Sequence, residues 1–276
     1  MNPVTHCRVY HKNSKSFVYL PQFKFDRPYI IFLHGSHGFT KHNLKYITLL
    51  CSLGFSVIAP NHMVYNTCDE YNSTIDTIEG NKSTYKCVIN LRLREIEAIL
   101  DYINDNNITL IGSSEGGVIT SICKHPSIIC KIISSYSGEH TYFHDTCLYT
   151  RPDMKIINII GSHDEYFGRF ESIMSKYKST KPFIGHASYC LSKKNTDYSH
   201  VYVLSNCHHN FLFECYSTVR KLLLFHLRSQ TKLDDSKIRN IVLQNQRIIW
   251  FQIQLNSITQ ISTFGKKIYI LERKRS

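Results

Sequence analysis

The stretch Asn107-Ile-Thr-Leu-Ile-Gly-Ser-Ser-Glu-Gly-Gly117 decides the fold. A short apolar run, residues 108–111, leads into the pentapeptide Gly112-Ser-Ser-Glu-Gly116 and then into a segment with helical character. In a Gly-x-Ser-x-Gly sequence between a strand and a helix, the sharp turn holds the central residue, Ser114, in a strained conformation with its side chain exposed. The two glycines let strand and helix approach closely, since a Cβ atom at either position would clash. The same pentapeptide also occurs in ordinary loops, so its meaning depends on the rest of the chain.

The composition is that of a globular protein large enough to bury a core. The 276 residues are 42% hydrophobic and 20% charged, which suits one large α/β domain or two small ones. The net charge of +12 is unevenly placed, because residues 231–276 hold nine Lys or Arg and three Asp or Glu. This basic end could contact an anionic surface weakly or be a solvated tail. We expect no specific nucleic-acid binding, because the charge is not interleaved with a recognisable binding module.

Cysteine and histidine spacing gives no sign of a metal site. The ten cysteines form no CxxC pair, and the histidines form neither HxH nor HExxH, so no metal is predicted. Residues 1–19 lack the apolar core of a signal peptide, and no segment is apolar enough to span a membrane. We therefore expect a cytoplasmic protein with reduced, mostly buried thiols, Cys207 among them.

Strands and helices alternate along most of the chain. The run Pro28-Tyr-Ile-Ile-Phe-Leu33 is typical of a strand buried on both faces. Alternation of such strands with helices predicts a mostly parallel central sheet covered by helices on both faces, with an N-terminal antiparallel hairpin. In residues 248–258 the pattern suits either a helix or a strand. The expected strands are residues 7–11, 16–20, 28–33, 55–59, 108–111, 131–135, 155–160 and 200–204, and the expected helices are residues 43–53, 84–104, 116–124, 169–177 and 214–228.

Four expected strand ends carry glycine-rich or reactive clusters. In an open parallel sheet, ligands bind beyond the carboxyl ends of the strands, so these clusters are expected to converge. That convergence is a stronger signal than any one motif. The clusters are residues 34–38, 112–116, 161–165 and 206–211.

A serine hydroxyl is a poor nucleophile near neutral pH, so Ser114 needs a base within hydrogen-bond reach. His208 and His209 are the histidines that follow the expected strand 200–204. We favour His209, because Phe211 lies two residues further on and could anchor the loop. His208 remains the alternative.

A third group must orient that base. Asp164 directly follows the expected strand 155–160 and lies between nucleophile and histidine in the chain, so it is the favoured acid. Glu165 and Glu139 remain alternatives. We expect backbone N–H groups of Ser36 and Glu115 to stabilise the oxyanion that forms when Ser114 attacks a carbonyl.

These residues resemble those of the α/β-hydrolase superfamily, and within it the chain is most similar to the dienelactone hydrolase-like group of small esterases. The resemblance covers about residues 7–230. We expect residues 1–230 to form one domain, followed by an extension at 231–276. It implies Ser114, Asp164 and His209 as a catalytic triad. Dienelactone hydrolase itself has a cysteine nucleophile, so Ser114 favours a carboxylic ester or thioester as substrate. The matching segments are His34-Gly-Ser-His-Gly38, Gly54-Phe-Ser-Val-Ile-Ala-Pro60, Gly112-Ser-Ser-Glu-Gly-Gly117, Gly161-Ser-His-Asp164 and His209-Asn-Phe211.

The predicted function is a serine hydrolase that acts on a small or medium ester or thioester through an acyl-enzyme, without cofactor or metal. Residues 136–154 are too few for a large cap domain. Their aromatic residues Tyr142, Phe143 and Tyr149, together with the polar segment 61–83, are expected to wall the site. Two alternatives remain open. One is a non-catalytic binding protein of the same fold, and the other is an acyltransferase or peptidase that uses the same triad.

Overall fold

The structure, a computed structural model of residues 1–276, divides into two compact units. The first holds residues 1–132 and 139–149, and the second holds residues 133–138 and 150–276. The residues described are 5–11, 14–20, 29–55, 57–61, 78–103, 106–136, 148–166, 199–228, 248–254, 257–262 and 269–272.

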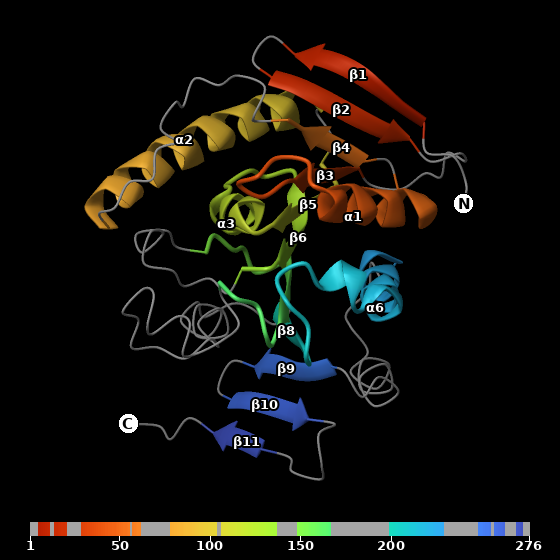
Figure 1. Ribbon diagram of the computed structural model, residues 1–276, viewed down its shortest axis with the longest axis vertical. Coiled ribbons are helices and arrows are strands. Elements are labelled where there is room, and N and C mark those ends of the chain that lie inside the picture. The colour runs from red at the N-terminus through yellow and green to blue at the C-terminus, as the bar shows by residue number, and fades with distance from the viewer. Residues whose placement is uncertain are drawn as a thin grey trace. The chain divides into compact units, whose positions relative to one another are not determined.

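The first unit is built on a parallel core with an antiparallel edge (Figure 1). Strands β1 (Thr5–His11) and β2 (Ser14–Leu20) form the predicted hairpin, and β4 (Val57–Pro60) pairs antiparallel with β2. Strand β3 (Ile30–Leu33) then pairs parallel with β4 and with β5 (Ile108–Ser113). All four residues of β3 are fully buried, as its unbroken apolar sequence predicts.

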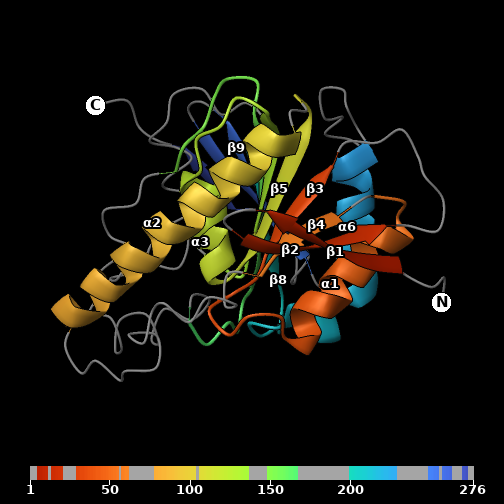
Figure 2. The ribbon, with the colours of Figure 1, turned by 90° about the horizontal axis from the view of Figure 1, so that it is seen from above.

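Helices cover both faces of these strands, which confirms that part of the predicted architecture. Helix α1 (Lys41–Ser52) lies on one face, while α2 (Ile78–Ile103) and α3 (Glu115–Ile122) lie on the other (Figures 1 and 2). Helix α2 begins at Ile78 rather than near residue 84. No helix in the described part of the chain is long and apolar enough to cross a membrane.

Helix α1 forms where a helix was expected, but it covers residues 41–52 rather than 43–53, and its buried face differs in one residue. The Thr40 side chain accepts a hydrogen bond from the backbone N–H three residues on, as an N-cap does. Gly54 follows the helix with a φ of 90°, which other residues rarely adopt. Ile47 and Leu50 are buried as expected, whereas Leu44 is 42% exposed. The sequence pattern places Leu44, Ile47 and Leu50 on one face of this helix, and that prediction is wrong for Leu44.

A buried lysine closes the C-terminal end of α3. Lys131, on β6 (Ile128–Ser134), donates to the carbonyl oxygens of Ser121, Cys123 and Tyr149 at 3.0, 2.8 and 2.9 Å. The first two are carbonyls that a helix end leaves without partners, and a cation there suits the helix dipole. Because Ser114 precedes α3 and Tyr149 lies at its other end, about 12 Å away for eight residues, the expectation that Tyr149 walls the site is wrong. Tyr142, Phe143 and most of residues 61–83 lie outside the described residues.

The second unit contains a parallel pair of strands that is extended by antiparallel ones. Strands β7 (Lys155–Gly161) and β8 (Ser199–Leu204) run parallel. Strand β9 (Ile248–Gln254) pairs antiparallel with β8, and β10 (Ser257–Ser262) and β11 (Tyr269–Glu272) follow it. Residues 248–254 therefore form a strand rather than a helix. The division into a 1–230 domain and a 231–276 extension stays a prediction, and the expected helix at 169–177 lies outside the described residues.

Helix α6 (Tyr216–Arg228) covers a group of buried polar rings in this unit. His226 on α6 lies with its Nε2 2.7 Å from the Tyr202 hydroxyl, and Lys155 donates to the His226 carbonyl at 3.0 Å. Burial, together with the positive charge of Lys155, lowers the pKa of His200 to about 3. Burial also holds the pKa of His226 well below its usual value, with His200 and Lys155 adding to the effect. These two histidines are therefore neutral in the folded protein at ordinary pH.

Candidate active site

Ser114 occupies the strained turn that its sequence predicts. It lies between β5 and α3 with φ 57° and ψ −121°, a conformation that is uncommon for any residue with a Cβ atom. Its carbonyl oxygen accepts hydrogen bonds from the N–H groups of Gly117 and Val118 at 2.8 and 3.2 Å. These bonds begin the helix directly after Ser114 and hold the serine at its N-terminus.

The two glycines of the pentapeptide are required by close backbone contacts. A Cβ atom on Gly112 would overlap the carbonyl oxygen of Gly116 and the Thr120 hydroxyl. A Cβ atom on Gly116 would overlap the carbonyl oxygens of Leu33 and His34 at the end of β3. The sequence-based argument for these glycines is confirmed. The turn allows no side chain where the strand, the helix and the neighbouring loop meet.

The loop after β3 runs beside Ser114. A Cβ atom built on Gly35 would lie 3.1 Å from the Ser114 Cβ atom and 3.6 Å from its hydroxyl oxygen. The loop is a tight turn in which the Gly38 N–H donates to the Gly35 carbonyl at 3.2 Å. The side chain of Asn43 on α1 donates to the Gly38 carbonyl at 2.8 Å. Ser36 is therefore part of a fixed turn against the serine, and its role as an oxyanion donor stays a prediction.

A buried arginine that the sequence analysis missed joins this loop to the turn at Ser114. Arg92 on α2 is 2% exposed, and its guanidinium donates to the Glu115 carboxylate and, at 2.6 Å, to the His34 carbonyl. One sequence signal could have found it. Arg92 lies three residues after Ile89 and four before Ile96, both buried, so it shares their face of the helix.

His34 is buried and uncharged beside this arginine. Burial, reinforced by the Arg92 charge, lowers the pKa of His34 to about 3. Its Nδ1 lies 2.7 Å from the Gly35 carbonyl oxygen, so the neutral ring donates its proton there. The ring thus supports the loop beside Ser114.

In the second unit, Asp164 and His209 form a histidine–carboxylate pair. The Asp164 Oδ2 atom lies 2.8 Å from His209 Nδ1, and the two side chains are 0% and 14% exposed. With Nδ1–H donated to the carboxylate, the Nε2 atom is left to accept a proton, which is the arrangement a general base requires. The structure thus brings together the two residues that the sequence analysis favoured as acid and base.

The backbone around His209 is fixed on both sides. Its N–H donates to the Glu165 carboxylate at 2.9 Å, and its carbonyl accepts from the Ser135 hydroxyl at 2.7 Å. Glu165 therefore holds the loop and not the ring of the base. Asp164 is held in turn, because its Oδ1 accepts the N–H of Tyr166 at 2.9 Å. Glu139 lies outside the described residues, and no sequence pattern pointed to Ser135.

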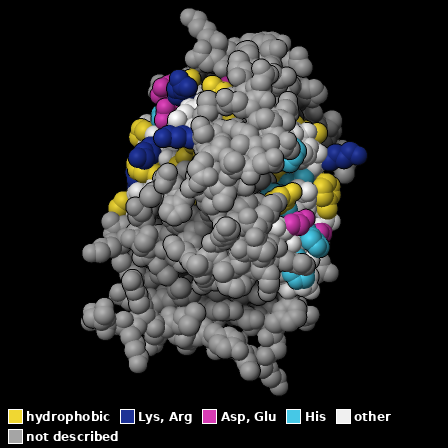
Figure 3. All heavy atoms as spheres, turned by 60° about the vertical axis from the view of Figure 1, so that its left-hand side comes forward, with side chains coloured by type: hydrophobic (Ala, Val, Ile, Leu, Met, Phe, Trp, Pro, Cys, Tyr) yellow, Lys and Arg dark blue, Asp and Glu magenta, His cyan; other side chains and the backbone are white. Residues whose placement is uncertain are grey.

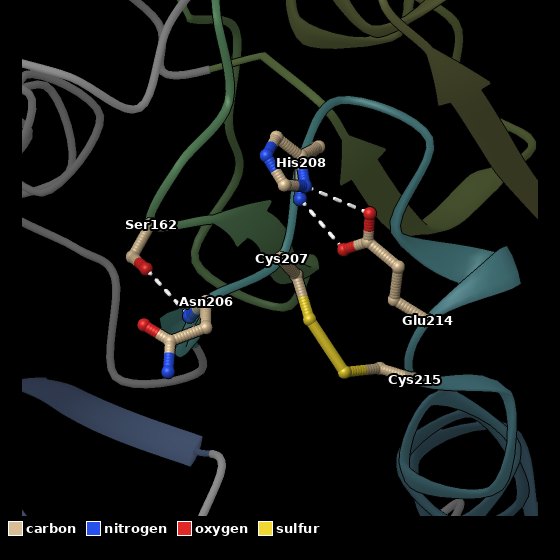
Figure 4. Close-up of a disulfide and its surroundings, with 6 residues drawn as sticks. All are labelled: Ser162, Asn206, Cys207, His208, Glu214 and Cys215. Atoms are coloured by element: carbon tan, nitrogen blue, oxygen red, sulfur yellow. Dashed lines mark hydrogen bonds and ion pairs between the residues drawn. A yellow bond between two sulfur atoms is a disulfide. The ribbon is translucent and has the colours of Figure 1, made fainter.

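His208 has a different partner (Figure 4). Glu214 accepts from the backbone N–H of His208 and lies against its Nδ1, both at 2.8 Å, and the His208 side chain is 49% exposed. Phe211 is fully buried, as expected of an anchor for this loop. The preference for His209 over His208 as the base is therefore consistent with the ring partners, which are Asp164 for His209 and Glu214 for His208.

A disulfide closes the same loop. Cys207 and Cys215 are bonded to each other (Figure 4), so the expectation that Cys207 is a packed thiol was wrong. Cys51, Cys123 and Cys130 are buried and form no disulfide, as predicted. The strand β7 ends against this loop, because a Cβ atom on Gly161 would overlap the Cys207 carbonyl. Disulfides are rare in the cytosol of most organisms, so the cytoplasmic location stays a prediction.

Histidine and acidic side chains lie near one another on part of the described surface (Figure 3). Among the described residues, no group of three or more histidine, cysteine or acidic side chains could hold a metal ion.

The fold is that of the α/β-hydrolases. A 2-hydroxy-6-oxo-6-phenylhexa-2,4-dienoate hydrolase from Rhodococcus sp. is similar, with 11% sequence identity and a TM-score of 0.55 over 83% of this chain and 100% of that chain. A protein from Klebsiella pneumoniae assigned as a dienelactone hydrolase shares 14% identity, with a TM-score of 0.54 over 83% of this chain and 100% of its own. Est1E from Butyrivibrio proteoclasticus shares 14% identity, with a TM-score of 0.51 over 79% and 97% of the two chains. Neither a protein-family model nor a curated protein sequence matches the chain.

Proposed function

We propose that the protein is a serine hydrolase with Ser114 as its nucleophile. The observation that carries this proposal is the conformation of Ser114, with a positive φ at the start of α3 and the Gly35 backbone beside its hydroxyl. A strained residue persists only where the surrounding structure enforces it, and such residues cluster at functional sites. The Asp164–His209 pair supports the proposal, because it is the acid–base combination that a serine nucleophile needs.

In the proposed mechanism, Ser114 attacks a carbonyl carbon while His209 Nε2 takes the hydroxyl proton. Asp164 stabilises the imidazolium that forms. The N–H groups of Ser36 and Glu115 bind the oxyanion, and the latter lies at the N-terminus of α3, where the helix dipole favours negative charge. His209 then returns the proton to the leaving group. In the second half of the reaction, His209 takes a proton from water, the water oxygen attacks the acyl carbon, and His209 gives the proton to the Ser114 oxygen as the acid leaves.

The proposed substrate is a carboxylic ester or thioester with a small or medium acyl group. The resemblance to the dienelactone hydrolase-like group supports this class, and two of the similar structures are described as hydrolases. A serine in place of the cysteine of dienelactone hydrolase argues against dienelactone itself. No cofactor takes part in the proposed reaction. We also propose a cytoplasmic location, which is supported by the buried cysteines Cys51, Cys123 and Cys130, none of which is part of a disulfide.

The test is replacement of the nucleophile. We expect Ser114→Ala to fold normally and to reduce turnover of a short-chain p-nitrophenyl ester by about 10⁴-fold or more, since triad residues act as a unit. Ser113→Ala is the matched control, because Ser113 is the adjacent serine on β5 and should retain turnover. An unchanged rate in Ser114→Ala would refute the assignment.

A fluorophosphonate probe separates this proposal from a non-catalytic binding protein of the same fold. Such probes phosphonylate only an activated serine, so a hydrolase should be labelled at Ser114 and a binding protein should not be labelled. Transfer of the acyl group to an acceptor other than water would show as an ester product when the assay contains a primary alcohol. Peptide cleavage would show on aminoacyl amide substrates.

A further inference from the structure

Arg92 is a buried arginine whose side chain contacts two separate segments of the first unit. It lies on α2, its guanidinium is paired with the Glu115 carboxylate, and a second N–H donates to the His34 carbonyl at 2.6 Å. Glu115 is 3% exposed, so the pair is removed from water on both sides. A planar guanidinium can hold two acceptors in a fixed relation, whereas an ammonium group cannot.

The two segments are the ones that carry the proposed oxyanion donors. Glu115 directly follows Ser114, and its own N–H is one donor. His34 begins the turn at Gly35–Gly38, which carries Ser36, the other donor. We infer that Arg92 is a positioning residue that sets the distance between these two donors and so determines how well they bind the transition-state oxyanion. This inference rests on the proposed function.

Charge gives Arg92 a second effect on the same site. The Glu115 carboxylate belongs to the residue next to the nucleophile, where an uncompensated negative charge would oppose a developing oxyanion. The paired guanidinium cancels that charge. Because α2 runs over 26 residues and the flanking Ile89 and Ile96 are buried, the guanidinium is held by a rigid element.

The first experiment compares Arg92→Lys with wild type in the full-length chain. The number of reactive sites is measured by fluorophosphonate titration, and kcat is expressed per titrated site. A lysine keeps the charge but cannot bridge both acceptors, so we expect kcat to fall about 10- to 100-fold, with a much smaller change in KM. The Ki of an alkyl trifluoromethyl ketone, whose adduct places an oxyanion at the donors, should rise by the same factor.

The matched control is Arg94→Lys. Arg94 is exposed on the same helix and donates to the Asn90 carbonyl one turn earlier. Its replacement should leave kcat, KM and the ketone Ki unchanged. The pair of variants separates the position of Arg92 from the general effect of an arginine-to-lysine change on α2.

A second variant, Arg92→Met combined with Glu115→Gln, removes both members of the ion pair and so does not leave the Glu115 carboxylate buried without its cation, and it should fold even if single loss of the arginine does not. It keeps the Glu115 backbone N–H and loses the bridge to His34. We expect the same loss of kcat per titrated site, with a thermal midpoint close to that of the wild type. A purely structural arginine would lower the midpoint or the titrated fraction and leave kcat per site intact.

The outcomes are distinct for the two proposals. A wild-type chain that takes up no fluorophosphonate and binds no ketone overturns the proposed function and this inference with it. A wild type that reacts, beside variants whose kcat per site and ketone Ki equal its own, overturns the inference alone. A parallel loss of kcat and ketone affinity in both Arg92 variants supports it.

Discussion

Ser114 combines two properties that a serine in an ordinary turn lacks. Its φ of 57° places the side chain at the end of β5, and the Gly35 backbone passes beside its hydroxyl. Turn residues with positive φ are usually glycine or asparagine, because a Cβ atom makes the conformation costly. Residues that bear a cost of this kind cluster at functional sites, so the conformation supports the proposed role of Ser114.

His208 and His209 provide a comparison between neighbours. The His209 ring is held by buried Asp164, while the His208 ring is held by the partly exposed Glu214. We expect His209→Ala to lower turnover by at least about 1,000-fold, since the hydroxyl proton loses its acceptor. His208→Ala is the matched control and should keep most of the activity. Ester assays on both variants measure the difference, and the opposite ranking would assign the base to His208.

At the scale of elements, the site depends on three backbones that meet without side chains between them. Strand β3, strand β5 and helix α3 approach so closely that Gly112 and Gly116 are the residues that fit. Arg92 reaches the same point from α2, and Asn43 reaches the neighbouring turn from α1. Helices α1 and α2 thus each contribute one side chain that holds the backbone near Ser114.

We predict a graded effect of alanine at these glycines. In Gly116→Ala, the added Cβ meets backbone oxygens of β3 that cannot move aside, so the free energy of unfolding should fall by about 3 kcal/mol or more. In Gly35→Ala, the nearest atom would be the Ser114 Cβ at 3.1 Å. That variant should lose less stability and still lose activity, because the methyl group lies beside the nucleophile.

Urea unfolding and ester turnover measured on both variants check this ranking. Equal stability of Gly116→Ala and wild type would contradict the packing of strand, turn and helix described above.

At the scale of the whole molecule, buried titratable groups make stability depend on pH. Burial lowers the pKa of His34 and of His200 to about 3 and that of His226 well below its usual value. Below the unfolded value of 6.5, the unfolded chain binds protons that the folded chain does not, so stability falls as the pH falls from 6.5 toward 3. Each histidine contributes about 1.4 kcal/mol per pH unit in this window.

Glu95 acts in the opposite direction. Burial raises its pKa to about 7, with Arg92 partly offsetting the effect. Between pH 4.5 and 7 the folded chain therefore holds a proton that the unfolded chain has lost, and stability rises as the pH falls. Three histidines oppose this one carboxyl, so we expect the protein to lose stability as the pH falls through 5.

Urea midpoints at pH 7.5 and pH 5.5 measure this dependence. We expect a clearly lower midpoint at pH 5.5 and a smaller difference in His200→Gln. His37→Gln is the control, because His37 is exposed and should not alter the difference. Equal midpoints at the two pH values would contradict neutral buried histidines.

Much of the fold follows from local sequence pattern. Apolar runs such as that of β3 are strands because only burial on both faces suits them. Helix α1 stops just before Gly54, which adopts a positive φ that residues with a Cβ atom rarely adopt. The turn at Ser114 is predictable once the strand before it and the helix after it are recognised, since the two glycines let strand and helix approach closely around the serine. These features depend on neighbours in the chain.

The tertiary structure decided what local pattern leaves open. It assigned Asp164 rather than Glu165 to the His209 ring, formed a strand from residues 248–254 by pairing them with β8, and joined Cys207 to Cys215. It also placed Arg92 against Glu115 and His34, which are 23 and 58 residues away. Hydrogen bonds and ion pairs between distant segments depend on which backbones are brought together, and only the packed chain determines that.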